Sequence, residues 1–299
     1  MAFADDLQSA ISAVAERVGP SVVGIGSRQR GSGIVLADGK VLTNAHNIRG
    51  DEVTVTFADG RSIRGQVAGV DVDGDLAVVN VDTAGAPALA WGDGSAATPG
   101  SVVFGASATS DGGTRITFGT VSAVARAFRG PGGRRIAGSV EHTAPLAPGS
   151  SGGPIVDAGG ALLGLNTNRL DEGFYLALPA DAALRERVDQ LGRGESVRRP
   201  RLGVAVAPAY VAARLRRSVG LPERDGLLVR GVEDGSPAAR AGIQEGDLIV
   251  AAAGREVTDG DQLVEALASA GDTFEVKIVR GTEERTIQVG GSGTAAGEA

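Results

Sequence analysis

The sequence predicts a mostly β protein, in which a barrel or sandwich of short strands is followed by a smaller unit of mixed helices and strands. From Ser21 to about Leu178, short β-branched runs are punctuated by Gly, Asp and Pro at close intervals. This pattern favours a barrel or sandwich over a parallel α/β sheet. The 47 glycines, together with these short β-branched runs, also indicate turn-rich β structure.

Helices are predicted at both ends of this β region. Apolar residues recur at helical spacing in segment 1–20 and again in segment 180–191. Between these two segments, the predicted strands are 22–26, 33–36, 53–57, 75–81, 101–105 and 154–158.

A second unit follows a polar, Arg-rich segment that is bounded by Gly and Pro and therefore resembles a linker. In this unit Ser236 and Pro237 predict the start of one helix, and Thr258 is the predicted cap of another. The predicted organisation is a helical segment at 1–20, a β domain at 21–192, a linker at 193–200, a second domain at 201–290 and a disordered tail at 291–299.

The composition excludes several kinds of site. The chain of 299 residues has no Cys, which rules out thiol catalysis, disulfides and thiolate metal sites. Its two His residues speak against a His-rich metal site, and its net charge of -7 speaks against broad nucleic-acid binding. We therefore expect no cofactor, no bound metal and no nucleic-acid partner.

The sequence leaves the cellular compartment open. No apolar run is long enough to cross a bilayer, and the first residues lack the charged-then-apolar pattern of a signal peptide. Either the chain is cytoplasmic as written, or an export signal precedes it in a longer form.

The sharpest local motif is the turn Gly149-Ser150-Ser151-Gly152-Gly153. The glycines allow Ser151 to occupy a tight turn, with its hydroxyl exposed and the neighbouring N–H groups directed at one point. Donors arranged in this way stabilise the oxyanion of acyl transfer. No His follows Ser151, so the turn is not the nucleophile elbow of an α/β-hydrolase, in which the His comes later in the chain.

Two His residues compete for the role of general base. His46 ends an apolar strand in small and polar residues, which suits a base at a strand–loop junction. His142 lies shortly before Ser151, and no acidic residue stands between them. We therefore interpret His142 as structural and His46 as the base.

The carboxylate that orients the base is expected at the entry to another strand. Asp75 opens an apolar strand, where it can become buried and accept the imidazole N–H, and Asp71 and Asp73 are nearby rivals. The chain order His46, Asp75, Ser151 is that of chymotrypsin and not that of subtilisin.

Taken together, these motifs resemble those of the HtrA/Deg family of serine proteases. The segments TNAHN, DGDLAVV and GSSGGP are similar to the His, Asp and Ser motifs of that family, and Gly31-Ser32-Gly33 is a supporting match. The resemblance implies a chymotrypsin-like double β-barrel followed by a small α+β PDZ domain. It also implies that the three motif residues form a catalytic triad.

The resemblance further assigns the surroundings of the triad and a peptide groove in the second domain. The groove would receive a peptide C-terminus as an added strand. The residues implied are Gly149, Ser150 and Ser151 for the oxyanion hole, Pro145, Leu146 and Asn166 for a specificity pocket for small aliphatic side chains, and Arg201, Leu202, Gly203, Val204, Leu263 and Leu267 for the groove.

The function expected on these grounds is a serine endopeptidase that cleaves unfolded or misfolded proteins and uses the PDZ domain to recognise peptide C-termini. A homotrimer is one expected assembly, because members of the family often form trimers. The alternative from another class is a non-catalytic chaperone or peptide-binding adaptor. The chain departs from the family pattern at Ser150, where Asn is usual, and at Asn47, where Val is usual.

Overall fold

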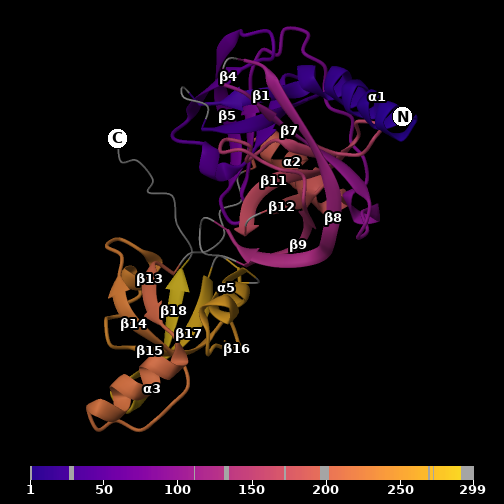
Figure 1. The fold of residues 1–299 in the computed structure, drawn as a ribbon. Helices are drawn as coiled ribbons and strands as arrows, with labels where there is room; N and C mark the ends of the chain where they lie inside the picture. The colour runs from indigo at the N-terminus through magenta and orange to yellow at the C-terminus, as the bar shows by residue number, and fades with distance from the viewer. Residues whose placement is uncertain are drawn as a thin grey trace, which may run out of the picture. The chain divides into compact units, whose positions relative to one another are not determined.

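The computed structural model confirms the mostly β fold and divides into two compact units, Met1–Val197 and Arg198–Ala299 (Figure 1). Unit 1 contains two closed barrels, and unit 2 contains one sheet with helices. Each unit is described by itself below. The structure describes residues 2–26, 30–110, 112–130, 135–171, 173–195, 202–268, 270–271 and 273–290.

The first barrel closes through antiparallel pairing in the order β1-β2-β3-β6-β5-β4. Short hairpins keep its strands short; Asp38 and Gly39, with φ values of 61° and 68°, turn the chain between β2 and β3. Its interior is filled by β-branched and aromatic side chains such as Val35, Val55 and Phe57. The strands are β1 (Val22–Ile25), β2 (Gly31–Leu36), β3 (Lys40–Thr43), β4 (Glu52–Thr56), β5 (Ser62–Asp71) and β6 (Leu76–Asn80).

The second barrel closes in the order β10-β11-β12-β9-β8-β7, the same strand order as in the first barrel when read by position. Val103, Val121, Val140 and Ile155 are buried in its interior. The strands are β7 (Val102–Ala108), β8 (Thr114–Arg129), β9 (Arg135–His142), β10 (Pro154–Val156), β11 (Leu162–Asp171) and β12 (Phe174–Pro179).

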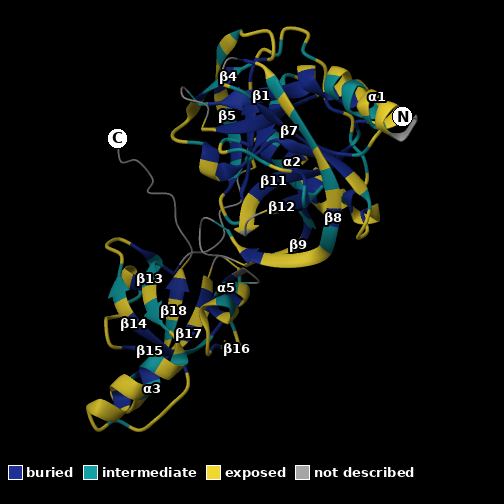
Figure 2. Cartoon of the chain, viewed as in Figure 1, coloured by how far each residue is buried: buried dark blue, intermediate teal, exposed yellow. Residues whose placement is uncertain are grey.

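One large apolar core joins the two barrels and two helices within unit 1. The N-terminal helix α1 (Ala2–Val18) contributes Val14 and Val18, and helix α2 (Ala182–Gly192) contributes Leu184 to the same cluster. Figure 2 shows strands such as β1 and β7 mostly buried, whereas the outer side of α1 and much of β8 and β9 are exposed. The two barrels are therefore held in a fixed relation to each other, as an active site made by both requires.

Unit 2 is a sheet in the order β13-β14-β15-β17-β18, with β16 paired to β15. Ser236 caps a helix as predicted, by accepting the Ala239 N–H at 3.1 Å. The other predicted cap is wrong by one residue, because Asp259 and not Thr258 accepts the Gln262 N–H at 2.9 Å. The elements are β13 (Val204–Ala207), α3 (Ala209–Ser218), β14 (Leu227–Val232), α4 (Pro237–Arg240), β15 (Leu248–Ala252), β16 (Arg255–Glu256), α5 (Gly260–Ala268), β17 (Thr273–Arg280) and β18 (Glu283–Gly290).

Candidate active site

His46 and Asp75 form a close pair in the first barrel. His46 follows β3 in the short 3₁₀ turn η2 (Ala45–Asn47), Asp75 precedes β6, and the pairing of β3 with β6 brings the two residues together. The imidazole Nδ1 lies 2.9 Å from both Oδ1 and Oδ2 of the carboxylate. The backbone N–H of His46 also donates to Oδ1, at 3.2 Å. The ring nitrogen left for another partner is therefore Nε2.

Donors from both barrels hold the buried carboxylate of Asp75. Its side chain is 0% exposed, whereas that of His46 is 29% exposed. Thr167 Oγ1, on β11 of the second barrel, donates to Oδ2 at 2.6 Å. These contacts supply the donors that a buried carboxylate requires. Of the two rival carboxylates, Asp71 instead faces Arg187 of α2 at 3.5 Å.

Thr167 also connects this pair to Ser151. Ser151 Oγ donates to the backbone carbonyl of Thr167 at 3.3 Å, while the Thr167 hydroxyl bonds Asp75. Sequence reasoning missed this residue. The sequence did offer one signal for Thr167, because the segment Gly164–Thr167 resembles the HtrA/Deg pattern. That resemblance does not indicate a contact between Thr167 and Asp75.

Within the described residues, the Ser151 hydroxyl is bonded to the Thr167 carbonyl and not to His46. Catalytic hydrogen bonds are often long or misaligned in the absence of substrate.

The turn before Ser151 contains two backbone N–H groups that have no acceptor among the described contacts. Gly149 has a φ of +86°, and the Ser150 N–H donates to the Ala147 carbonyl at 3.2 Å. With Pro148 in the second position and a left-handed Gly in the third, this is the pattern of a type II turn. Among the described contacts, the N–H groups of Gly149 and Ser151 have no acceptor, so both are available to an oxyanion, whereas the Ser150 N–H is used inside the turn.

A hollow of about 200 Å³ opens beside Ser151. Leu146 and Asn166, two of the residues expected in the specificity pocket, line it, and Tyr175 of β12 forms part of its wall. Pro145, the third expected residue, is not part of the lining. The space is small, which suits a small or medium side chain.

His142 lies behind this hollow, against Asn166 and Tyr175, and apart from the His46–Asp75 pair. Its Nε2 is 2.9 Å from Asn166 Oδ1, and its ring stacks on Tyr175 with centroids 5.8 Å apart. Burial lowers the pKa of His142 to about 4, partly opposed by the hydrogen bond to Asn166. The ring is therefore neutral near pH 7 and supports the wall of the hollow.

The described residues contain no group of three or more His, Asp or Glu side chains that would hold a metal ion.

Comparisons with known proteins match both units. Residues 31–165 match the family described as "Trypsin-like peptidase domain", and residues 228–280 match "PDZ domain". A putative serine protease HhoA from Synechocystis is 34% identical over 278 residues, which cover 87% of this chain and 70% of that protein. The chain belongs to the HtrA/DegP-like trypsin-like serine proteases. It carries one C-terminal PDZ domain.

Other members of the HtrA family agree in fold and differ in length. A probable periplasmic serine endoprotease, DegP-like, from Halomonas elongata is 31% identical over 271 residues, which cover 88% of this chain. The chain spans only 56% of the length of that relative. Among solved structures, the HtrA-type protease AlgW with decapeptide is similar, with a TM-score of 0.70 at 26% identity over 94% of this chain and 97% of that one.

Several residues of the expected PDZ groove belong to the core of the domain. Leu202, Leu263 and Leu267 are buried in its main apolar cluster, and Val204 is half-buried on β13, which is an end strand of the sheet. Gly203 has a φ of +75° and accepts the Glu233 N–H through its carbonyl at 2.9 Å. Arg201 lies outside the described residues. An end strand leaves a backbone edge to which a peptide can add.

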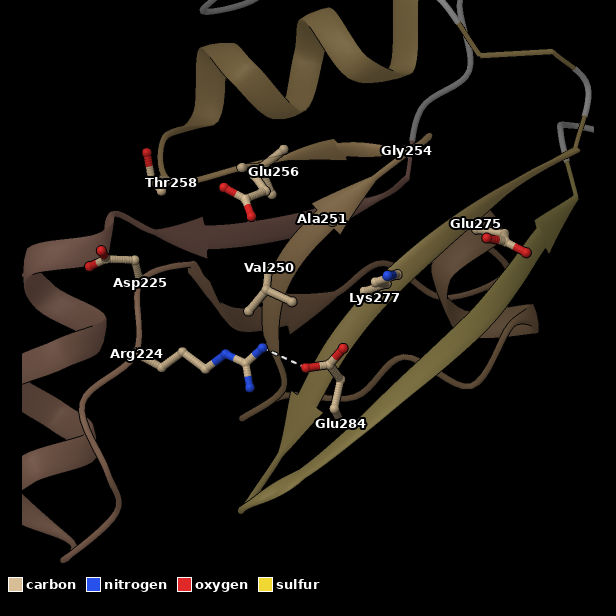
Figure 3. Close-up of a pocket in the computed structure, with 11 residues that line it drawn as sticks. Arg224, Asp225, Val250, Ala251, Gly254, Glu256, Thr258, Glu275, Lys277 and Glu284 are labelled. Carbon is tan, nitrogen blue, oxygen red and sulfur yellow. Dashed lines mark hydrogen bonds and ion pairs between the residues drawn. The ribbon is translucent and has the colours of Figure 1, made fainter.

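A second hollow of the PDZ domain, of about 490 Å³, is separate from these residues (Figure 3). Its lining is mainly charged, and Figure 3 shows Arg224 paired with Glu284. Glu256 lies on β16 and Lys277 on β17, two strands that both pair with β15. None of the expected groove residues lines this hollow.

Among the described residues, no helix has the length and apolar character needed to span a membrane.

Proposed function

We propose that the chain is a serine endopeptidase in which Ser151 is the nucleophile, His46 the general base and Asp75 the orienting carboxylate. The observation that carries the proposal is the continuous contact path from Ser151 Oγ through Thr167 to Asp75 and His46. This path brings three residues that are distant in sequence to one partly exposed site. His142, the other His of the chain, is buried and bonds Asn166, which leaves His46 as the proposed base.

The mechanism is acyl transfer in two steps. His46 Nε2 takes the proton of Ser151 as its oxygen attacks a peptide carbonyl, and the imidazolium is stabilised by Asp75. The N–H groups of Gly149 and Ser151 bind the tetrahedral oxyanion. His46 then protonates the departing amine, and water hydrolyses the acyl-enzyme by the same route.

The proposed substrates are unfolded or misfolded polypeptides. An endopeptidase needs an extended backbone in its cleft, and the small hollow beside Ser151 favours the aliphatic side chains that folding normally buries. The PDZ domain is proposed to bind peptide C-termini along β13. A homotrimer is part of the proposal, and sedimentation of the Ser151→Ala chain measures the assembly without self-cleavage.

The test compares the wild-type chain with Ser151→Ala on an unfolded protein substrate. Turnover should fall on the order of 10⁶-fold, by analogy with other triads. A fluorophosphonate probe should label Ser151 in the wild type and not in the variant. If the variant cleaves at the wild-type rate, the triad assignment is wrong. A chain that binds C-terminal peptides but is never labelled, with or without such a peptide, would instead be a non-catalytic adaptor.

A further inference from the structure

Ser32, in the first barrel, contacts the nucleophile turn of the second barrel at two points. It lies on β2 and is completely buried. Its backbone N–H donates to the Ser151 carbonyl at 2.8 Å, and its hydroxyl donates to the Gly149 carbonyl at 2.8 Å. One residue therefore bonds the carbonyl groups on both sides of Ser150.

The direction of the hydroxyl bond is fixed by its neighbours. The backbone N–H of Ala108 lies 3.1 Å from Ser32 Oγ and can only donate. The Gly149 carbonyl can only accept, and a hydroxyl has one proton. The single proton of Ser32 is therefore directed at Gly149, and one of its lone pairs receives Ala108. This buried hydroxyl has no freedom to rotate without losing a partner.

These bonds restrain the peptide that carries one of the oxyanion donors. The peptide between Gly149 and Ser150 is held at both ends, at its carbonyl by Ser32 and at its N–H by Ala147. On the other side, the Ser151 carbonyl is held by the Ser32 N–H. The Ser151 N–H belongs to the peptide between Ser150 and Ser151. This peptide is therefore restrained by hydrogen bonds on both sides.

The approach of the two barrels at this point is unusually close. Gly152 has a φ of +86°, and a Cβ placed there would lie 2.1 Å from the Ser32 carbonyl oxygen. A Cβ on Gly31 would lie 2.2 Å from the side chain of Asn47, whose Nδ2 donates to the Ser151 carbonyl at 3.0 Å. The first barrel is therefore in direct contact with the turn at Ser151 and Gly152.

We propose that Ser32 is a positioning residue that aims the oxyanion donors of Gly149 and Ser151 without itself touching the substrate. The inference rests on the proposed serine protease function. Oxyanion donors are effective because they are oriented before charge develops. Removing the hydroxyl leaves the Gly149 carbonyl and the Ala108 N–H without this partner, so the turn gains freedom while His46 and Asp75 keep their contacts.

The test is Ser32→Ala in the full chain, compared with the wild type on one peptide substrate. We expect kcat to fall about 10-fold, which is less than the 10²–10³-fold loss seen when an oxyanion donor itself is removed. KM should stay within about 2-fold of the wild-type value, because the ground-state contacts remain. A peptide boronate, which becomes a tetrahedral anion on Ser151, should bind about 10-fold more weakly, while the corresponding unreactive peptide should bind equally well to both chains.

Three variants control this comparison. Ser139→Ala removes another fully buried hydroxyl, one that has no hydrogen-bond partner among the described residues, and it should leave kcat and boronate affinity unchanged. Asn47→Val removes the other bond to the Ser151 carbonyl but keeps the bond to Gly149, so its loss of boronate affinity should be smaller than that of Ser32→Ala. Ser32→Cys fills the space with a weak donor and should reproduce the selective loss.

The outcomes separate the two proposals. A wild type that neither hydrolyses the peptide nor binds the boronate contradicts the proposed function. An active wild type with a Ser32→Ala variant of equal boronate affinity, or an Asn47→Val variant that loses as much, contradicts only the role of Ser32. Unfolding of both Ser32 variants below the assay temperature also overturns it, because the hydroxyl would then hold the barrel and not the turn.

Discussion

At the scale of single residues, Asp75 combines an unusual backbone with full burial. Its φ of 57° lies in the left-handed region, which non-glycine residues rarely occupy and in which Asp and Asn are the most tolerated. A residue in this region costs about 1–3 kcal/mol of strain, which the surrounding contacts must offset. The contacts from His46 and Thr167 hold the carboxylate in that position.

Asp75→Asn should preserve the backbone and abolish most of the activity. Asn tolerates the same φ, but its amide cannot accept all the bonds that His46 and Thr167 donate, so the imidazole loses its correct tautomer. By analogy with another triad, kcat should fall about 10⁴-fold. Steady-state hydrolysis of a peptide substrate measures this, with a melting curve as the control for folding. A loss below 10-fold would show that Asp75 does not orient His46.

The proposed triad could be predicted from the sequence because each member stands in a local motif, whereas the residues that support it could not. His46, Asp75 and Ser151 each have telling neighbours in the chain. The roles of Thr167 and Ser32 depend on contacts across 92 and 117 positions of sequence, respectively. A Thr or Ser without a local pattern gives no sign of such a partner, so these roles emerge only when the two barrels are assembled.

His142 should make the stability of unit 1 depend on pH. Its pKa is lowered to about 4 by burial, while an unfolded His titrates near 6.5, so the unfolded chain binds more protons below pH 6.5. Stability is thus fully present above this pH and is lost as the pH falls toward 4, by about 2–3 kcal/mol at pH 4.5. Urea unfolding at pH 7 and pH 4.5 measures the loss.

The matched variant for this prediction is His142→Gln, which keeps a donor for Asn166 but does not titrate. It should be less stable than the wild type at pH 7 because it packs less well against Tyr175, yet it should lack the His-dependent loss in acid. Identical pH slopes for the two chains would show that other groups dominate acid unfolding of this unit.

At the scale of elements, helix positions were predicted well and their ends less well. The helix expected at 180–191 is α2, which spans Ala182–Gly192 and is capped by Asp181 through the Leu184 N–H at 2.8 Å. The cap of α5 was misplaced because Thr258 and Asp259 are both capping residue types. The structure resolves the choice, since Gln262 accepts from Thr258 while donating its N–H to Asp259.

Helix α1 is part of the core of unit 1 and not an appendage. Val18 is 0% exposed and packs in the cluster that joins the barrels. Val18→Asp should therefore destabilise unit 1 by about 3 kcal/mol or more, since it buries an unpaired charge. Denaturant unfolding measures this, and Gln8→Asp on the exposed side of the same helix is the control. Equal stability of the two variants would mean that α1 detaches without cost.

At the scale of the whole molecule, the sequence indicated a β domain and a mixed domain but not how the strands close. Barrel closure depends on pairs such as β1 with β4 and β10 with β7, which join strands that are not neighbours in the chain. Periodicity along a single strand says which side is buried and nothing about which strand lies beside it. The family resemblance, and not the pattern itself, supplied the double barrel.

The boundary between the domains remains a proposal that proteolysis can test. The predicted linker 193–200 contains several Arg residues, so brief trypsin treatment of the Ser151→Ala chain should cut there first and release two fragments that each keep their secondary structure. Mass spectrometry locates the cut, and circular dichroism of the separated fragments tests folding. First cuts inside either β barrel would contradict the proposed division.

The hydrogen bond between Thr167 and the Asp75 carboxylate has a consequence for synthesis of the protein. A chain leaving the ribosome builds its acid–base half early, but the hydroxyl that steadies Asp75 and the serine that attacks come much later, from strands of the second barrel. A nascent chain that ends before Thr167 therefore lacks the hydroxyl that holds the Asp75 carboxylate. All the proposed catalytic groups are therefore present once the second barrel has been made, before the PDZ domain at residues 228–280 is added.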